Sequence, residues 1–271
     1  MVENYMHACR IGFSVCHIKL RFARVCCAVS LLFVMLTVEA GPVGDGADNN
    51  AAIVRWAKGS YQYGKLDSGL IRGYEDWTLT VHPDGSRTLQ AFVNLHDGDH
   101  QTNAILRVGD NFRPLDGFVS FWRGGVYGGA GWYRLDGDNL HASVSGPRGQ
   151  ANHSITVPQR VSLRVHPVIT EGWQVWSYDQ SSDGPQQGVL YNVVTVGNPP
   201  VPGIGVLLEH RIDYHGRETV TVPAGTFDAE HYTFYDGRYD IWLWGPDQIL
   251  VRYANFGNGN EYRLTTLETS P

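Results

Sequence analysis

The sequence has very little cysteine. Its four cysteines, Cys9, Cys16, Cys26 and Cys27, lie within the first 27 residues, so residues 28–271 contain none. Disulfide bonds, zinc–thiolate sites and cysteine nucleophiles are therefore excluded for that long stretch. Its stability must come from the burial of apolar surface, which a chain of this length provides without covalent cross-links.

Several common catalytic motifs are also missing. The sequence contains no Gly-x-Ser-x-Gly elbow, which argues against a serine hydrolase of that type. The glycine-rich run at residues 124–131 is not followed by Lys-Ser or Lys-Thr or by a helix signal, so neither a P-loop nor a dinucleotide site is expected. In a strand context such glycines mark bulges or a close approach to the backbone.

Positive charge is scarce. The chain has 21 Lys and Arg against 27 Asp and Glu, a formal net charge of −6. Without the first forty residues, which hold four basic and two acidic side chains, the balance becomes 17 − 25 = −8. An acidic surface argues against nucleic acid or an anionic membrane as a partner.

The first forty residues have the pattern of an export signal. Lys19, Arg21 and Arg24 precede an apolar run at residues 25–38, and residues 38–40 place small side chains at the two positions that a signal peptidase reads. The run is shorter than the roughly twenty residues that span a bilayer. We therefore expect a cleaved signal peptide, 1–40, no stable membrane anchor, and a periplasmic or secreted mature protein.

Residues 41–271 have the pattern of a single all-β domain. Strand-like segments separated by turn signals occur at residues 77–82, 87–95, 101–108, 117–122, 132–135, 140–144, 154–157, 161–165, 173–178, 189–196, 206–214, 249–256 and 261–268. They predict an antiparallel meander that forms a barrel, a half-barrel or a sandwich, and the barrel is favoured because closure removes exposed edges. We expect one short N-terminal helix, capped by Asp48 or Asn49, that runs through Trp56 and ends at Gly59.

The strongest local signal is Asp236-Gly237, which lies between two strand-like runs and predicts a tight β-hairpin. The expected cross-strand pairs are Phe234 with Tyr239, Thr233 with Asp240, Tyr232 with Ile241, and His231 with Trp242. Because side chains alternate between the two faces of a strand, one face is apolar. The other face collects Ala229, His231, Thr233, Asp240, Trp242 and Trp244.

That second face is the candidate site. His231 and Asp240 are expected to be diagonal neighbours, and a carboxylate there would fix one imidazole tautomer and raise its basicity. Trp242 and Trp244 are expected to shape an apolar wall, to which Trp173 and Trp176 add a second aromatic block. The structural alternative is that the tryptophans pack under a neighbouring segment and the His–Asp pair stabilises the hairpin.

Two functions fit these residues. The first is binding of a hydrophobic or aromatic small molecule in an aromatic-lined interior cavity, because eight tryptophans and fourteen tyrosines exceed what a core needs, and aromatic-walled interiors suit flat apolar or sugar-like ligands. The alternative is a cofactor-independent lyase, isomerase or hydratase that uses the His–Asp pair as acid and base. No cofactor is expected, and the sequence leaves open whether the protein is an enzyme and in which oligomeric state it exists.

A histidine-rich segment, residues 96–100, invites a metal-site interpretation. If Asp97-Gly98 forms a turn, His100 pairs with Leu95, and His96 and His100 point to opposite faces. Zinc needs three or four convergent ligands. We therefore expect a hairpin tip and no metal site here.

The C-terminal region resembles a bacterial family of exported proteins. The residues concerned are 220–227 (Val-Thr-Val-Pro-Ala-Gly-Thr-Phe), 241–244 (Ile-Trp-Leu-Trp) and 262–264 (Tyr-Arg-Leu), within about the last fifty residues. Where that family continues with an acidic pair and a proline, this chain has Gly245-Pro246-Asp247. That family is described only as a domain of unknown function with an all-β half-barrel fold. The resemblance implies such a fold and an envelope location, and it implies no catalytic residues.

Overall fold

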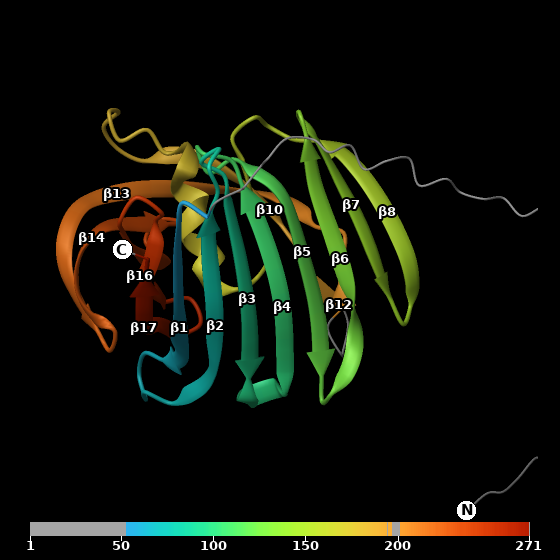
Figure 1. Ribbon diagram of the computed structural model, residues 1–271, viewed down its shortest axis with the longest axis horizontal. Coiled ribbons are helices and arrows are strands. Elements are labelled where there is room, and N and C mark those ends of the chain that lie inside the picture. The colour runs from blue at the N-terminus through green and yellow to red at the C-terminus, as the bar shows by residue number, and fades with distance from the viewer. Residues whose placement is uncertain (1–52, 194, 197–200, 271) are drawn as a thin grey trace, which may run out of the picture. The chain divides into compact units, whose positions relative to one another are not determined.

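The polypeptide is built almost entirely from β-strands (Figure 1). The structure is a computed structural model that describes residues 53–193, 195–196 and 201–270, all within the unit Asp48–Pro271. The predicted export signal lies outside the described residues. The elements are β1 (Arg55–Lys65), β2 (Ile71–Val81), β3 (Arg87–Leu95), η1 (His96–Gly98), β4 (His100–Val108), β5 (Pro114–Arg123), β6 (Val126–Asp136), β7 (Asn139–Gly146), β8 (Gly149–Thr156), β9 (Val161–Arg164), η2 (Val168–Ser177), β10 (Gln186–Asn192), β11 (Thr195–Val196), β12 (Val201–Pro202), β13 (Val206–Val222), β14 (Gly225–Phe234), β15 (Tyr239–Trp244), β16 (Ile249–Asn255) and β17 (Asn260–Thr269).

Fifteen of the described strands form one sheet, in the order β8-β7-β6-β5-β4-β3-β2-β1-β17-β16-β15-β14-β13-β10-β9, and β11 and β12 form a small separate ribbon. The central β1 pairs with both β2 and β17, which joins the N-terminal meander to the C-terminal strands. The all-β prediction is confirmed in its open, half-barrel form, because β8 and β9 are free edges and the sheet is not closed. The β9–β10 pair is parallel, which departs from the antiparallel prediction.

Alternation along the strands gives the sheet two faces. On β2, Glu75, Trp77 and Leu79 are buried, whereas Asp76 and Thr78 between them are exposed. Glu75 contacts η2, so the buried set defines the inner face of the sheet and the alternate set defines the outer face. The inner face carries the hydrophobic core, and this period of two is the reason that these segments form strands.

The helix η2 lies within the curve of the sheet (Figure 1). Nine of its ten residues are buried. Gly172 lets it approach closely, because a Cβ there would lie 2.8 Å from Leu243 and 2.9 Å from the carbonyl oxygen of Gln248. The part of the interior beside β15 and β16 is therefore occupied by the protein's own chain.

A buried carboxylate holds the N-terminal end of η2. Glu75 accepts hydrogen bonds from the backbone N–H groups of Val168 (2.7 Å) and Ile169 (3.1 Å), and from the hydroxyl of Tyr63. The first N–H groups of a helix have no partner within it, and a negative charge is favourable at this end. Glu75 thus ties the helix to the first half of the sheet.

The structure overturns two of the predicted elements. Residues 173–178, predicted as a strand, belong largely to η2. The spacing of apolar residues in so short and so largely buried a segment does not distinguish a strand from a helix. The predicted N-terminal helix is wrong where it can be compared, since β1 begins at Arg55 and its first residues pair with β2, and from Ala57 on with β17 as well. Pairing on both sides overrides local helix propensity. Residues 48–52 of that helix lie outside the described part.

The register of the central hairpin is confirmed, although its loop is longer than two residues, since β14 ends at Phe234 and β15 begins at Tyr239. All four predicted pairs, from Phe234 with Tyr239 to His231 with Trp242, occur between β14 and β15. Asp236 and Gly237 both have positive φ, at 57° and 80°, as a tight turn requires. The preceding turn between β13 and β14 folds back toward β17, because the N–H of Ala224 donates to the carbonyl of Leu264 (3.1 Å).

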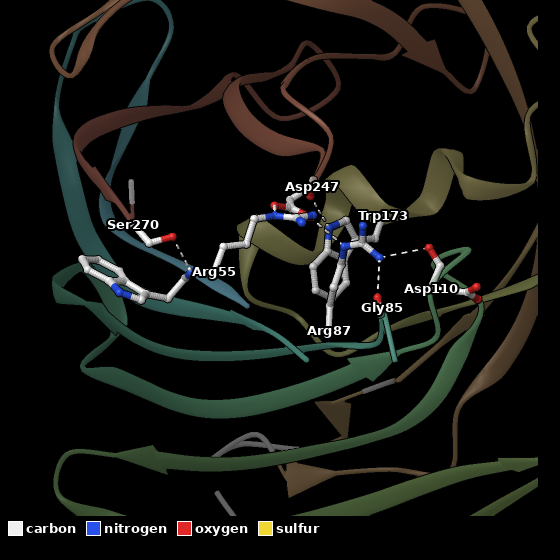
Figure 2. A network of polar contacts seen from close by, with 8 residues as sticks. Arg55, Gly85, Arg87, Asp110, Trp173, Asp247 and Ser270 are labelled. Atoms are coloured by element: carbon white, nitrogen blue, oxygen red, sulfur yellow. Dashed lines mark hydrogen bonds and ion pairs between the residues drawn. The ribbon is translucent and has the colours of Figure 1, made fainter. Parts of the chain in front are cut away.

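A network centred on Asp247 fastens the seam between the two halves of the sheet (Figure 2). Its carboxylate accepts hydrogen bonds from Arg55 on β1 (2.6 and 2.8 Å) and from Arg87 on β3 (2.9 Å). Its carbonyl accepts one from Nε1 of Trp173 on η2 (3.0 Å). Arg87 also lies over the ring of Phe112, 4.0 Å from its centre. The turn between β15 and β16 is thus tied to two strands and to the helix.

Candidate functional site

The predicted acid–base pair, His231 and Asp240, lies on the face of the β14–β15 hairpin that points away from η2. Nε2 of His231 is 3.6 Å from Oδ2 of Asp240, and each side chain is 19% exposed. This separation is too long for a good hydrogen bond, so the contact is electrostatic when the imidazole is charged. The strand register predicted from the sequence therefore placed these two residues together correctly.

A second carboxylate and an indole complete this cluster. Oε1 of Glu218 on β13 lies 3.3 Å from Nδ1 of His231 and also accepts a hydrogen bond from Nε1 of Trp242. The imidazole stacks on the indole with ring centres 4.7 Å apart and planes at 12°. The guanidinium of Arg252 also lies over the indole, 4.9 Å from its centre. Trp242 is only 6% exposed, so it offers little surface to a ligand.

A groove of about 290 Å³ lies next to this cluster. Its lining residues are Arg211, Asp213, His215, Thr233, Asp236 and Gly237. Thr233 is directly opposite Asp240, and Nε2 of His215 is 3.0 Å from Oγ1 of Thr233. His231 and Asp240 are not among the lining residues, so the pair neighbours the groove without forming its wall.

The other predicted tryptophans are dispersed. Trp173 is buried in η2 and donates to Asp247, and Trp176 donates to the hydroxyl of Ser162 (3.1 Å). Trp244 packs against Phe227 and lines a small pocket of about 150 Å³ beside β1. The structure does not bring Trp173, Trp176, Trp242 and Trp244 to one wall.

The most strongly perturbed titratable groups surround η2 in the interior. Burial raises the pKa of Glu75 to about 7 and also raises that of Glu171, which pairs with Arg164 at 2.5 Å. Burial lowers the pKa of His166 and His210 to about 4, so both imidazoles are neutral at pH 7. These groups contact the protein's own chain, through the Arg164–Glu171 ion pair and the ring contacts of His166 and His210, and contribute to the fold.

The outer face of the sheet carries a feature that the sequence analysis missed. One residue from each of eight neighbouring strands lies in a continuous line of cross-strand partners. This outer row consists of Lys58, Thr78, Gln90, Ile105, Phe118, Trp132, Ser143 and Asn152. With about 4.8 Å between strands, the outer row is roughly 34 Å long.

Two grooves follow the outer row. The first, of about 530 Å³, crosses β17 and β1 to β5 and is lined by apolar groups such as Phe92, Ile105 and Phe118. The second, of about 680 Å³, crosses β6, β7 and β8 and is lined by Trp132 and polar side chains. The rings of Phe118 and Trp132 are 5.9 Å apart. This ring pair lies where the two grooves meet.

Large apolar side chains on this face remain in water. Trp132 is 49% exposed and Phe92 is 39% exposed, although each lies in the middle of a regular strand. A contiguous exposed apolar patch on an otherwise polar face is typical of a binding surface. The signal was present in the sequence, since Phe92, Phe118 and Trp132 occupy the polar phase of alternation. Only the strand register shows that Phe118 and Trp132 are cross-strand partners on the face that also carries Phe92.

The histidine-rich segment forms the hairpin tip that was predicted between β3 and β4. Leu95 pairs with His100, with η1 between them. Asp97 makes an ion pair with Arg72 (2.5 Å), and His96 packs against Tyr74. Within residues 53–193, 195–196 and 201–270, no three His, Cys, Asp or Glu side chains are grouped so that they could bind a metal ion.

No described helix is long and apolar enough to cross a bilayer.

Comparison with known proteins supports the fold. No protein-family model matches the chain, and no curated protein matches it either. The chain is similar in structure to a β-barrel-like protein of the domain of unknown function DUF1849 from Brucella abortus, with a TM-score of 0.52 and 10% identity over 80% of this chain and 98% of the other. A DUF1089 family protein from Pseudomonas aeruginosa matches more weakly, with a TM-score of 0.39 and 10% identity over 68% and 90%. The first likeness agrees with the all-β fold of a domain of unknown function that the C-terminal resemblance implied.

Proposed function

We propose that this protein binds a small molecule with an apolar or aromatic surface, and that the ligand lies in the first groove against Phe92, Ile105 and Phe118. The observation that carries the proposal is the partly exposed apolar part of the outer row inside a groove of about 530 Å³. This volume is in the range of small-molecule sites.

The location differs from the interior cavity expected from sequence. The helix η2 packs against the inner face, with nine of its ten residues buried. On the outer face, Gln90 and Asn103 also line the first groove, and neither side chain bonds to another described residue. They are free to orient a ligand whose apolar part lies on Phe118. A few polar groups among apolar ones are typical of small-molecule sites.

The experiment titrates the protein with 1-N-phenylnaphthylamine, a neutral aromatic probe whose fluorescence rises in apolar surroundings. We expect saturable binding with a Kd of about 10 μM to 1 mM, and a loss of about tenfold in Phe118→Ser, because the variant removes most of one apolar wall. Phe256→Ser is the control, since Phe256 is 57% exposed and lies outside this groove. Equal affinity in all three proteins would refute the proposal.

The acid–base pair supports a second candidate function. His231 and Asp240 lie 3.6 Å apart beside a groove, which is an arrangement that a cofactor-independent lyase, isomerase or hydratase could use. Glu218 competes for the same imidazole and would hold its other nitrogen. If turnover of a compound is found, His231→Ala and Asp240→Asn should each abolish it with a nearly unchanged melting temperature. Activity that survives in both variants would end this interpretation.

We also propose that the protein is exported to the periplasm or secreted, without a stable membrane anchor and without nucleic acid as a partner. The basis is the apolar run at residues 25–38 with its small residues at 38–40, and the acidic balance of residues 41–271. N-terminal sequencing of the protein recovered from its native host should begin at Gly41. An intact chain in the cytoplasm would contradict export.

A further inference from the structure

The second groove differs from the first in its chemistry. Around one exposed indole, that of Trp132, it gathers the polar side chains of Arg134, Asp136, His141, Ser143, Asn152, His153 and Ser154. We propose that this groove is a carbohydrate subsite in which a sugar ring of a neutral oligosaccharide stacks on Trp132. The proposal deepens the proposed function and rests on it, because the two grooves meet at the Phe118–Trp132 pair.

The strand register sets the size of the array of side chains at this end of the sheet, and that size matches one or two sugar rings. Trp132, Ser143 and Asn152 lie side by side on β6, β7 and β8, and Arg134, His141 and Ser154 form the next line two residues along. Two strand spacings and one two-residue step make an array of about 10 by 7 Å. One or two pyranose rings cover that area. Figure 1 shows these three strands at one end of the sheet.

The polar groups of this array are free to bind hydroxyls. Within the described residues, the side chains of Arg134, His141, Ser143, Asn152 and Ser154 make no hydrogen bond or ion pair with one another or with a neighbour. Together they offer both donors and acceptors, which is what a ring with several hydroxyl groups requires. An array of donors alone would instead fit an anion.

The charge of the groove favours a neutral ligand. Arg134 and Asp136 carry opposite formal charges and lie two residues apart on β6. The chain as a whole is acidic, with a formal net charge of −6. An anionic ligand would therefore meet little net attraction at this end of the sheet.

The indole is positioned for stacking. Trp132 is 49% exposed, and Phe118 supports it from the neighbouring strand at 5.9 Å with planes at 54°. One face of a pyranose ring consists of C–H groups, which pack on the electron-rich face of an indole while the hydroxyls at the ring edge remain available to polar neighbours. The flanking polar side chains then select the sugar.

The test is calorimetric titration of the full-length protein. The ligands are cellotetraose, maltotetraose, xylotetraose and chitotetraose, with tetragalacturonate as the anionic comparison. We expect at least one neutral tetrasaccharide to bind with a Kd of about 1 mM or tighter. Trp132→Ala should weaken it by about tenfold or more, and Asn152→Ala by about threefold to tenfold. Phe256→Ala should bind as the unaltered protein does.

The same variants separate this inference from the proposed function. Asn152→Ala should leave the binding of 1-N-phenylnaphthylamine unchanged, because Asn152 lines only the second groove. Retained probe binding with no response to any neutral tetrasaccharide, or with tetragalacturonate as the only sugar bound, would overturn the carbohydrate subsite alone. Absence of probe binding by the unaltered protein would overturn the proposed function itself. Sugar binding that survives Trp132→Ala would also refute the subsite.

Discussion

Glu75 makes the protein's stability depend on pH in an unusual direction. Burial raises the pKa of this carboxyl to about 7, against the opposing effect of the hydrogen bonds from Tyr63, Ile169 and Val168. A carboxyl with a raised pKa binds its proton more tightly in the folded state than in the unfolded chain. Its contribution to stability is therefore fully present below pH 4.5 and is lost as the pH rises toward 7.

The size of the effect follows from the shift. A rise from 4.5 to about 7 corresponds to about 3 kcal/mol, at 1.36 kcal/mol for each pKa unit. His166 and His210 act in the opposite direction, since burial lowers their pKa to about 4 and stability from these groups rises with pH. The pH dependence of the unaltered protein's stability therefore does not show the contribution of Glu75 by itself. The difference in stability between the unaltered protein and a Glu75 variant isolates it.

The assay is urea denaturation of the unaltered protein and of Glu75→Gln at several pH values between 4 and 8. The amide cannot accept from both backbone N–H groups, so the variant should be less stable by about 2–4 kcal/mol at pH 4.5. The difference should shrink by about 3 kcal/mol by pH 7.5 as Glu75 ionises in the unaltered protein. Glu209→Gln, at an exposed position, is the control. A difference that stays constant across this range would refute the reasoning.

Two further predictions concern the seam and a close approach in the sheet. Asp247→Asn should lower the free energy of unfolding, measured in urea at pH 7, by about 3 kcal/mol, because Arg55 and Arg87 lose their charged partner. Burial raises the pKa of Asp247, but the hydrogen bonds from the two arginines outweigh it and hold this pKa below its usual value. The stability difference between the variant and the unaltered protein should therefore shrink in acid, where Asp247 becomes protonated. Gly59→Ala should cost about 1–3 kcal/mol, because the new methyl group would lie 2.4 Å from the carbonyl oxygen of Thr266; an unchanged melting temperature would contradict this.

Local signals predicted the hairpins well. The Asp236-Gly237 turn requires positive φ at both residues, and once it is fixed the period of two determines every pair from Phe234 to Trp242. The same reasoning placed His231 beside Asp240. Contacts between residues close in sequence are the ones that a turn signal can define.

Tertiary contacts account for what the sequence did not predict. Residues 173–178 alternate like a strand, but they join η2 because the Glu75 carboxylate, almost a hundred residues away, meets the first N–H groups of that helix. The N-terminal residues of β1 have helix-compatible composition, yet β2 and β17 pair with them from both sides. These partners lie far away in the sequence, so a pattern within a short segment does not reveal them.

The outer row was missed for a related reason. Phe92, Phe118 and Trp132 were each visible as large residues on the polar side of an alternating strand. Phe118 and Trp132 belong to the outer row, and Phe92 lies two residues along β3 from Gln90, the member that β3 contributes. The continuity of the row depends on every register from β1 to β8, and a one-residue slip in any pair would have broken it. The four predicted tryptophans do not form one wall because Trp173 and Trp176 belong to η2, whereas Trp242 and Trp244 lie on β15.

Binding on the outer face is tested most directly by NMR, which follows the indole N–H signals of the eight tryptophans during titration with 1-N-phenylnaphthylamine. Binding on the outer face predicts that the Trp132 signal shifts with the probe concentration, since Trp132 adjoins Phe118 at 5.9 Å. The signals of Trp173, buried in η2, and of Trp242, stacked on His231, should stay in place. Shifts of Trp173 or Trp242 without a shift of Trp132 would contradict the account.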